Sequence, residues 1–124
     1  MIELKKYFPN LSQVQLKQFK RLFPIYNDWN SKVNLISRRD IDNLFINHIL
    51  HSLSIVNIIK FKDTSSILDV GTGGGFPGIP LAIFFPNVKF TLLDSIGKKI
   101  KVVESVSKDL SLSNVTAIND RVEN

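Results

Sequence analysis

The first half of the chain has the periodic hydrophobic pattern of amphipathic helices. Ser12 and Gln15 have the spacing of a capping box, in which each side chain accepts a hydrogen bond from a free backbone N–H of the other residue. Apolar residues then recur at three- and four-residue steps, which is the period of one helix face. Pro24 interrupts this run, so we expect it to kink the helix or split it in two. The predicted apolar face comprises Leu16, Phe19, Leu22, Phe23, Tyr26, Trp29 and Val33.

A second helix is expected after a short polar connector at residues 37–40. Asp40 is a suitable N-cap, and a second apolar stripe follows it. We therefore expect residues 1–60 to form an N-terminal helical segment. The second stripe comprises Ile41, Leu44, Phe45, Ile49, Leu53, Val56 and Ile59.

The hydrophobic pattern changes at residue 61. Short apolar runs at 67–70, 88–93 and 115–118 predict strands, and the stretches between them predict helices. This β-α-β-α-β order is half of a doubly wound sheet, whose strands are parallel because each is followed by a crossover helix. Residues 61–124 are therefore expected to form the first half of a Rossmann-like α/β domain, in one compact unit with residues 1–60.

Composition narrows the classes of protein. A chain of 124 residues with 44% apolar and 22% charged residues is an ordinary single globular domain. The absence of cysteine excludes disulfides, thiolate metal sites and cysteine nucleophiles. Two histidines argue against a buried zinc site, so we expect no metal. No apolar run is long enough to span a membrane and the N-terminus does not resemble a signal peptide, so we expect a soluble, cytoplasmic chain.

The net charge of +5 belongs to the first half of the chain. Residues 1–60 hold nine Lys and Arg against four Asp and Glu, whereas residues 61–124 hold seven of each. A basic half suggests a surface that faces a polyanion, although solvated charges would give the same count. The candidate patch comprises Lys17, Lys20, Arg21, Lys32, Arg38 and Arg39.

A glycine-rich turn at residues 69–78 is the most informative stretch. Glycines at the exit of a parallel strand allow a sharp turn and let a ligand approach closely. Ligands of such sheets bind at the carboxyl ends of the strands, where Asp94 ends the next predicted strand. Asp94 could accept the ribose hydroxyls of a nucleoside, at about 1.5–3 kcal/mol per bond. We therefore predict a nucleoside-containing cofactor, with a purely structural turn as the alternative.

The details of the turn distinguish between two cofactors. Residues 73–78 fit the dinucleotide fingerprint G-x-G-x-x-G. However, Pro77 and Pro80 remove N–H donors that a pyrophosphate would need. Asp69 also places a negative charge beside the turn, which suits a cationic sulfonium, although it could simply cap the loop amides. The pattern Asp-x-Gly-x-Gly-x-Gly at residues 69–75 therefore favours S-adenosylmethionine.

These motifs resemble those of the glucose-inhibited division protein B family, the small-subunit ribosomal RNA methyltransferases G. The resemblance implies an S-adenosylmethionine-dependent methyltransferase with a Rossmann-like fold preceded by N-terminal helices, which methylates N7 of a guanine in 16S rRNA. The matching stretches are Trp29-Asn30, Asn34-Leu35, Arg39-Asp40, His48-Ile49-Leu50 with Ser52, Asp69–Gly73, Pro77–Leu81, Thr91–Ser95 with Gly97-Lys98, and Arg121-Val122-Glu123.

The resemblance also implies roles for individual residues. Gly71 and Phe76 would contact the methionine and adenosyl side of the cofactor. Asp94 and Ser95 would bind the ribose, and Val122 and Glu123 would flank the adenine. Phe76 replaces the leucine that is usual in the family. Gly73 is added to these residues because it allows a ligand to approach closely. The predicted cofactor-binding residues are therefore Gly71, Gly73, Phe76, Asp94, Ser95, Val122 and Glu123.

The implied chemistry requires little from side chains. Guanine N7 has an in-plane lone pair and no proton to remove, so we assign no catalytic residue. Lys98 and Lys99, with Arg38 and Arg39, could contact phosphates of 16S rRNA or of the small ribosomal subunit. Two other functions stay open: a methyltransferase of the same fold that acts on a small molecule or protein, and a non-catalytic cofactor-binding fragment.

Members of the family are longer than this chain and have more strands. The chain stops just after its third predicted strand, so the strand at 67–70 would lack a neighbour on one side. An apolar edge with unpaired backbone groups is prone to pair with another copy. We therefore expect edge-to-edge association, aggregation or incomplete folding of the isolated chain.

Overall fold

The order of helices and strands follows the hydrophobic pattern. The computed structural model describes residues 4–33, 43, 48–58 and 61–121, so the predicted N-cap at Asp40 lies outside the described residues. The five elements predicted after residue 61 are all confirmed, with ends within a few residues of those expected. The elements are α1 (Leu4–Tyr7), α2 (Gln13–Asn30), α4 (Leu50–Ile58), β1 (Ser66–Val70), α5 (Gly78–Phe84), β2 (Lys89–Asp94), α6 (Gly97–Asp109) and β3 (Val115–Asn119).

Helix α2 begins with the predicted capping box. The Ser12 amide donates to Gln15 Oε1 at 2.8 Å, and the Gln15 amide donates to Ser12 Oγ at 3.1 Å. The prediction that Pro24 would split the helix is wrong, because α2 continues through it to Asn30. Pro24 has no N–H, so the Lys20 carbonyl loses its usual helical donor; both residues are exposed. Buried side chains on both sides of Pro24 anchor the helix: Phe19, Leu22 and Tyr26.

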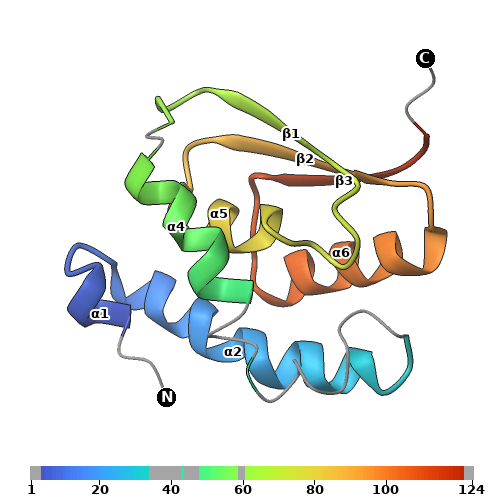
Figure 1. Ribbon diagram of the computed structural model, residues 1–124, viewed down its shortest axis with the longest axis horizontal. Coiled ribbons are helices and arrows are strands. Elements are labelled where there is room, and N and C mark those ends of the chain that lie inside the picture. The colour runs from blue at the N-terminus through green and yellow to red at the C-terminus, as the bar shows by residue number, and fades with distance from the viewer. Residues whose placement is uncertain (1–3, 34–42, 44–47, 59–60, 122–124) are drawn as a thin grey trace.

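The three strands form one parallel sheet with the order β1-β2-β3. Figure 1 shows the described helices together on one side of this sheet. On the other face Val70, Leu93 and Ile118 are neighbours in register. Leu68 and Val70 of β1 are 58% and 53% exposed. Within the described part of the chain, β1 is therefore an apolar edge strand, as predicted.

One hydrophobic core joins α2 and α4 to the sheet and its crossover helices. Side chains of α2 also donate to backbone carbonyls of the second half: Gln15 to Ile83 at 3.0 Å and Gln18 to Leu110 at 2.9 Å. Helix α2 is thus bonded to the ends of both α5 and α6. Of the helices that the structure describes, none is long and apolar enough to cross a membrane.

Candidate cofactor site

A pocket of about 330 Å³ lies at the carboxyl ends of the strands. This is the edge at which parallel α/β sheets bind ligands, and the volume is at the small end of ligand pockets. The structure brings together three of the predicted cofactor-binding residues here. The lining residues are Val70, Gly71, Leu93, Asp94, Ser95, Asp120 and Arg121.

Four glycines of the turn divide into two kinds. Gly71 and Gly73 have left-handed backbone conformations, with φ of +72° and +59°, and a Cβ added to either would meet nothing within 4 Å. Gly75 and Gly78 instead face other parts of the chain: a Cβ on Gly75 would lie 2.7 Å from Ile79 Cγ1, and one on Gly78 would overlap the Leu92 side chain. The first pair therefore leaves open space for a ligand, and the second pair allows the turn to pack against the protein.

Asp94 connects the glycine turn to the beginning of α6. Its Oδ2 accepts the Gly73 amide at 2.9 Å, and its Oδ1 accepts the Ile96 amide at 2.9 Å. A carboxylate oxygen can accept more than one hydrogen bond, so Asp94 retains capacity for ribose hydroxyls. The sequence located this carboxylate correctly but gave no sign of its two backbone partners.

Asp69 caps the turn from the β1 side. Its Oδ2 accepts the hydroxyl of buried Thr72 at 2.7 Å and the Gly78 amide at 3.2 Å. Burial raises the pKa of the Asp69 carboxyl, the bonds from Thr72 and Gly78 oppose this, and the charge of Asp94 adds to it. The interpretation of Asp69 as a cap of the loop is therefore confirmed.

Replacing Asp69 by alanine should lower the free energy of unfolding by about 1–3 kcal/mol, because the Thr72 hydroxyl and the Gly78 amide both lose their acceptor. Asp69→Asn keeps an acceptor oxygen and should cost less. Urea denaturation of the protein and its two variants measures these losses. Equal losses in both variants would show that the hydrogen bonds of Asp69 are unimportant.

The pH dependence of the same experiment has a definite sign. A raised pKa in the folded state means that the stability due to Asp69 is present below its ordinary pKa of 3.8 and is lost as the pH rises through the raised value. The stability of the wild type relative to Asp69→Asn should therefore fall as the pH is raised from below 3.8 to above it. A rise over that interval would contradict the assigned pKa direction.

The beginning of α5 does not suit a pyrophosphate. The amides of Gly78, Ile79 and Leu81 all donate to oxygens of this chain, at 3.2, 2.7 and 3.1 Å, and Pro80 has no N–H. A dinucleotide site needs such amides to point at the ligand. The preference for a sulfonium cofactor over a dinucleotide is consistent with this arrangement.

Other predicted residues lie elsewhere. The half-buried Phe76 does not line the pocket; its ring packs against Tyr26 and His48, with centroids 4.9 and 5.2 Å away. Lys98 is exposed and Lys99 half-buried in the first turn of α6, beyond Ser95. The predicted site residues that lie outside the described part of the chain are Arg38, Arg39, Val122 and Glu123.

Sequence reasoning assigned no role to two charged residues of the lining, Asp120 and Arg121. Their position was a usable signal, because they follow the third predicted strand and the carboxyl ends of parallel strands meet at one edge. No group of three metal-ligating side chains occurs among residues 4–33, 43, 48–58 and 61–121.

Comparison with known proteins identifies the family. The model of the GidB family, described as rRNA small subunit methyltransferase G, matches residues 15–124. The chain belongs to this family. It is 61% identical over 120 residues to the ribosomal RNA small subunit methyltransferase G of Christiangramia forsetii, and 58% identical over 120 residues to that of Bacteroides fragilis. These matches cover 97% of this chain but only 57% and 58% of the relatives, so the chain spans little more than half of their length.

Solved structures confirm the fold. Coclaurine N-methyltransferase bound to N-methylheliamine and SAH matches 59% of this chain and 21% of its own, with a TM-score of 0.54 and 22% identity. A SAM-dependent methyltransferase from Aquifex aeolicus matches 69% of this chain and 48% of its own, with a TM-score of 0.50 and 19% identity. At these identities the likeness concerns the fold alone, which is a partial Rossmann-like methyltransferase fold, as predicted.

Proposed function

We propose that the protein carrying this chain uses S-adenosylmethionine to methylate N7 of a guanine in 16S rRNA, and so acts in the cytoplasm. The observation that carries this proposal is the match of residues 15–124 to the rRNA small subunit methyltransferase G family. Relatives more than half identical to the chain bear that name.

The residues at the pocket suit the proposed cofactor. The open space in front of Gly71 and Gly73 allows a ligand to approach the backbone. Asp94 offers its remaining acceptor capacity to the ribose, and Ser95 lines the pocket next to it. Val122 and Glu123, which follow Arg121 in the sequence, complete the proposed site at the adenine.

The chemistry proposed for this site needs orientation rather than acid–base catalysis. The bound cofactor supplies a methyl group on a positively charged sulfur. Gly71, Gly73 and Asp94 would hold this cofactor, and the chemistry that it would supply is transfer of its methyl group to N7, with the neutral thioether as the other product. No proton leaves N7, so the protein has only to align the two groups, and alignment alone gives effective molarities of about 10⁵–10⁸ M. We therefore assign no catalytic residue.

Methyl transfer to 16S rRNA tests the proposal. The protein from the complete reading frame that contains this chain is incubated with labelled S-adenosylmethionine and small ribosomal subunits. Borohydride reduction and aniline cleavage then map N7-methylguanine. A label confined to one guanine N7 is expected, whereas a label on another atom, or only on protein or small molecules, would overturn the assignment.

Calorimetric titration with S-adenosylhomocysteine separates cofactor binding from RNA chemistry. Binding to both the 124-residue chain and the complete protein would show that these strands form a working half-site. Binding to the complete protein alone would place the function in the longer chain. Binding to neither would contradict the proposed cofactor.

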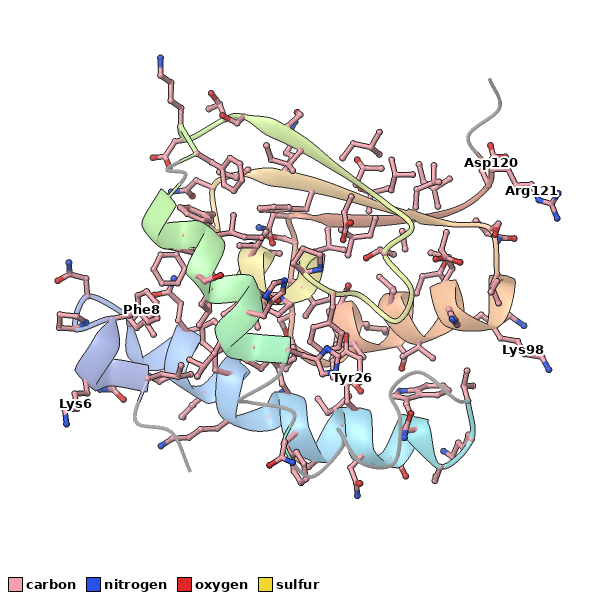
Figure 2. All side chains as sticks on the ribbon, viewed as in Figure 1. Lys6, Phe8, Tyr26, Lys98, Asp120 and Arg121 are labelled. Carbon is pink, nitrogen blue, oxygen red and sulfur yellow. The ribbon has the colours of Figure 1, made fainter. Side chains whose placement is uncertain are left out.

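The proposed RNA contacts include Lys98 and Lys99, with Arg38 and Arg39. Figure 2 shows Lys98 and Arg121 on the side of the molecule opposite to Lys6. If Lys98 neutralises one phosphate, Lys98→Gln should reduce the slope of log affinity against log salt by about one. Filter binding of the 16S rRNA at several salt concentrations measures this slope. Lys6→Gln is the matched control, and an equal change in both variants would reject a specific contact.

A further inference from the structure

Tyr26 is a buried residue of α2 that reaches the glycine turn. Its side chain is 0% exposed, and its hydroxyl donates to the Gly74 carbonyl at 2.7 Å. Burial raises the pKa of this hydroxyl, so it stays protonated and remains a donor. Figure 2 shows Tyr26 pointing from α2 toward the interior of the molecule. A residue of the N-terminal helices thus makes a hydrogen bond to the backbone of the turn, which lies 48 positions later in the sequence.

The neighbours of Gly74 in the turn also contact Tyr26. A Cβ on Gly75 would lie 2.8 Å from Tyr26 Oη, so the hydroxyl occupies the space that a side chain there would need. The Phe76 ring lies against the Tyr26 ring at 4.9 Å and against His48 at 5.2 Å. Residues 74–76 are therefore shaped by side chains from the first half of the chain.

A second element of the fold also holds the turn. The Gly73 amide donates to Asp94 Oδ2, while the next residue, Gly74, accepts from Tyr26. Two consecutive residues are thereby fixed by different elements, one by β2 and one by α2. Without Tyr26, the buried Gly74 carbonyl would lose its donor, and a conformation that turns this carbonyl toward water would become more favourable.

We propose that Tyr26 is a positioning residue that holds the glycine turn in its cofactor-binding conformation, so that helix α2 sets the affinity for the cofactor. The inference rests on the proposed use of S-adenosylmethionine. When only a fraction of the molecules has a competent turn, the apparent dissociation constant rises by the inverse of that fraction. Removal of the hydroxyl therefore weakens binding even though Tyr26 does not line the pocket.

Calorimetric titration of S-adenosylhomocysteine into three forms of the complete protein tests this role, well below their unfolding temperatures. Tyr26→Phe should raise the dissociation constant about five- to twentyfold, the loss expected when a buried carbonyl loses its donor. Phe19→Leu is the matched control, because Phe19 is equally buried two turns earlier on the same helix. It should lower the unfolding temperature and leave the affinity within about twofold. Unchanged affinity in Tyr26→Phe, or an equal loss in Phe19→Leu, would overturn the proposal.

Amide hydrogen exchange gives a readout that does not depend on ligand. The amides of Gly75 and Phe76 donate to the Thr72 carbonyl at 3.0 and 3.1 Å. In free Tyr26→Phe they should exchange faster than in the wild type, with no change in β2. Equal rates would count against the positioning role. Failure of the wild type to bind S-adenosylhomocysteine would instead count against the proposed function, and the exchange of the free proteins would still decide the role of Tyr26.

A third measurement needs no substitution at Tyr26. Since linkage between two sites is reciprocal, ligand binding at the turn should stabilise α2 around Tyr26. Adding S-adenosylhomocysteine to the wild type should therefore slow amide exchange in residues 25–28 as well as in the turn. Slower exchange in the turn with no change in residues 25–28 would overturn the coupling to α2.

Discussion

Replacing Gly73 by valine is expected to weaken the binding of S-adenosylhomocysteine by at least about 100-fold while the protein stays folded. Gly73 has a φ of +59°, and its missing side chain points into open space. In the folded protein the Cβ of this valine therefore meets no other residue, and the side chain extends into the space proposed for the ligand. The left-handed conformation adds roughly 1–2 kcal/mol of strain, which should lower the unfolding temperature without abolishing the fold.

Two other glycine variants separate the causes. Gly73→Ala carries similar backbone strain with little bulk, so calorimetry should show a loss of only about tenfold. Gly78→Ala should instead change the stability of the fold, because the added Cβ would overlap Leu92 and lie 2.9 Å from Asp69 Oδ2. It should destabilise the fold by about 1–3 kcal/mol through overpacking. If Gly73→Val binds within about threefold of the wild type, the turn does not approach the ligand closely.

The sequence predicted the elements around the site well because their signals are local. The Ser12–Gln15 capping box, the short apolar strand runs and the glycine turn depend on residues only a few positions apart. The position of Asp94 followed from one topological rule, that parallel strands present their carboxyl ends at the same edge. Signals of this kind can be read from a single chain.

Features that depend on tertiary packing could not be read in this way. Pro24 was expected to kink α2 or split it in two, and the split is wrong because the helix continues through Pro24, with buried residues on both sides of it. Tyr26 was predicted only as one member of an apolar stripe, because helical periodicity does not show which group a buried hydroxyl will hydrogen-bond. The packing of the Phe76 ring against Tyr26 and His48 was not predicted either, because the motif that contains Phe76 does not show which distant residues contact it.

Replacing Asp94 by alanine should weaken S-adenosylhomocysteine binding about tenfold to hundredfold, or about 1.4–2.8 kcal/mol. Two effects contribute in the same direction. The variant removes the proposed acceptor of the ribose hydroxyls, and it also releases the Gly73 and Ile96 amides, which Asp94 holds at 2.9 Å each. Asp63→Ala is the control, because Asp63 is an exposed aspartate that does not line this pocket. Unchanged affinity in Asp94→Ala would exclude both roles of Asp94.

A second ligand distinguishes the ribose contact from the capping of the turn. The titrations are repeated with a 2′-deoxy analogue of S-adenosylhomocysteine, which lacks one of the hydroxyls that Asp94 would accept. If Asp94 binds the ribose, the cost of Asp94→Ala should be smaller for the analogue than for the parent ligand, because the two changes remove the same hydrogen bond. If Asp94 only holds the amides of Gly73 and Ile96, the variant should cost the same for both ligands. The size of this coupling therefore measures how directly the carboxylate at the end of β2 recognises the cofactor.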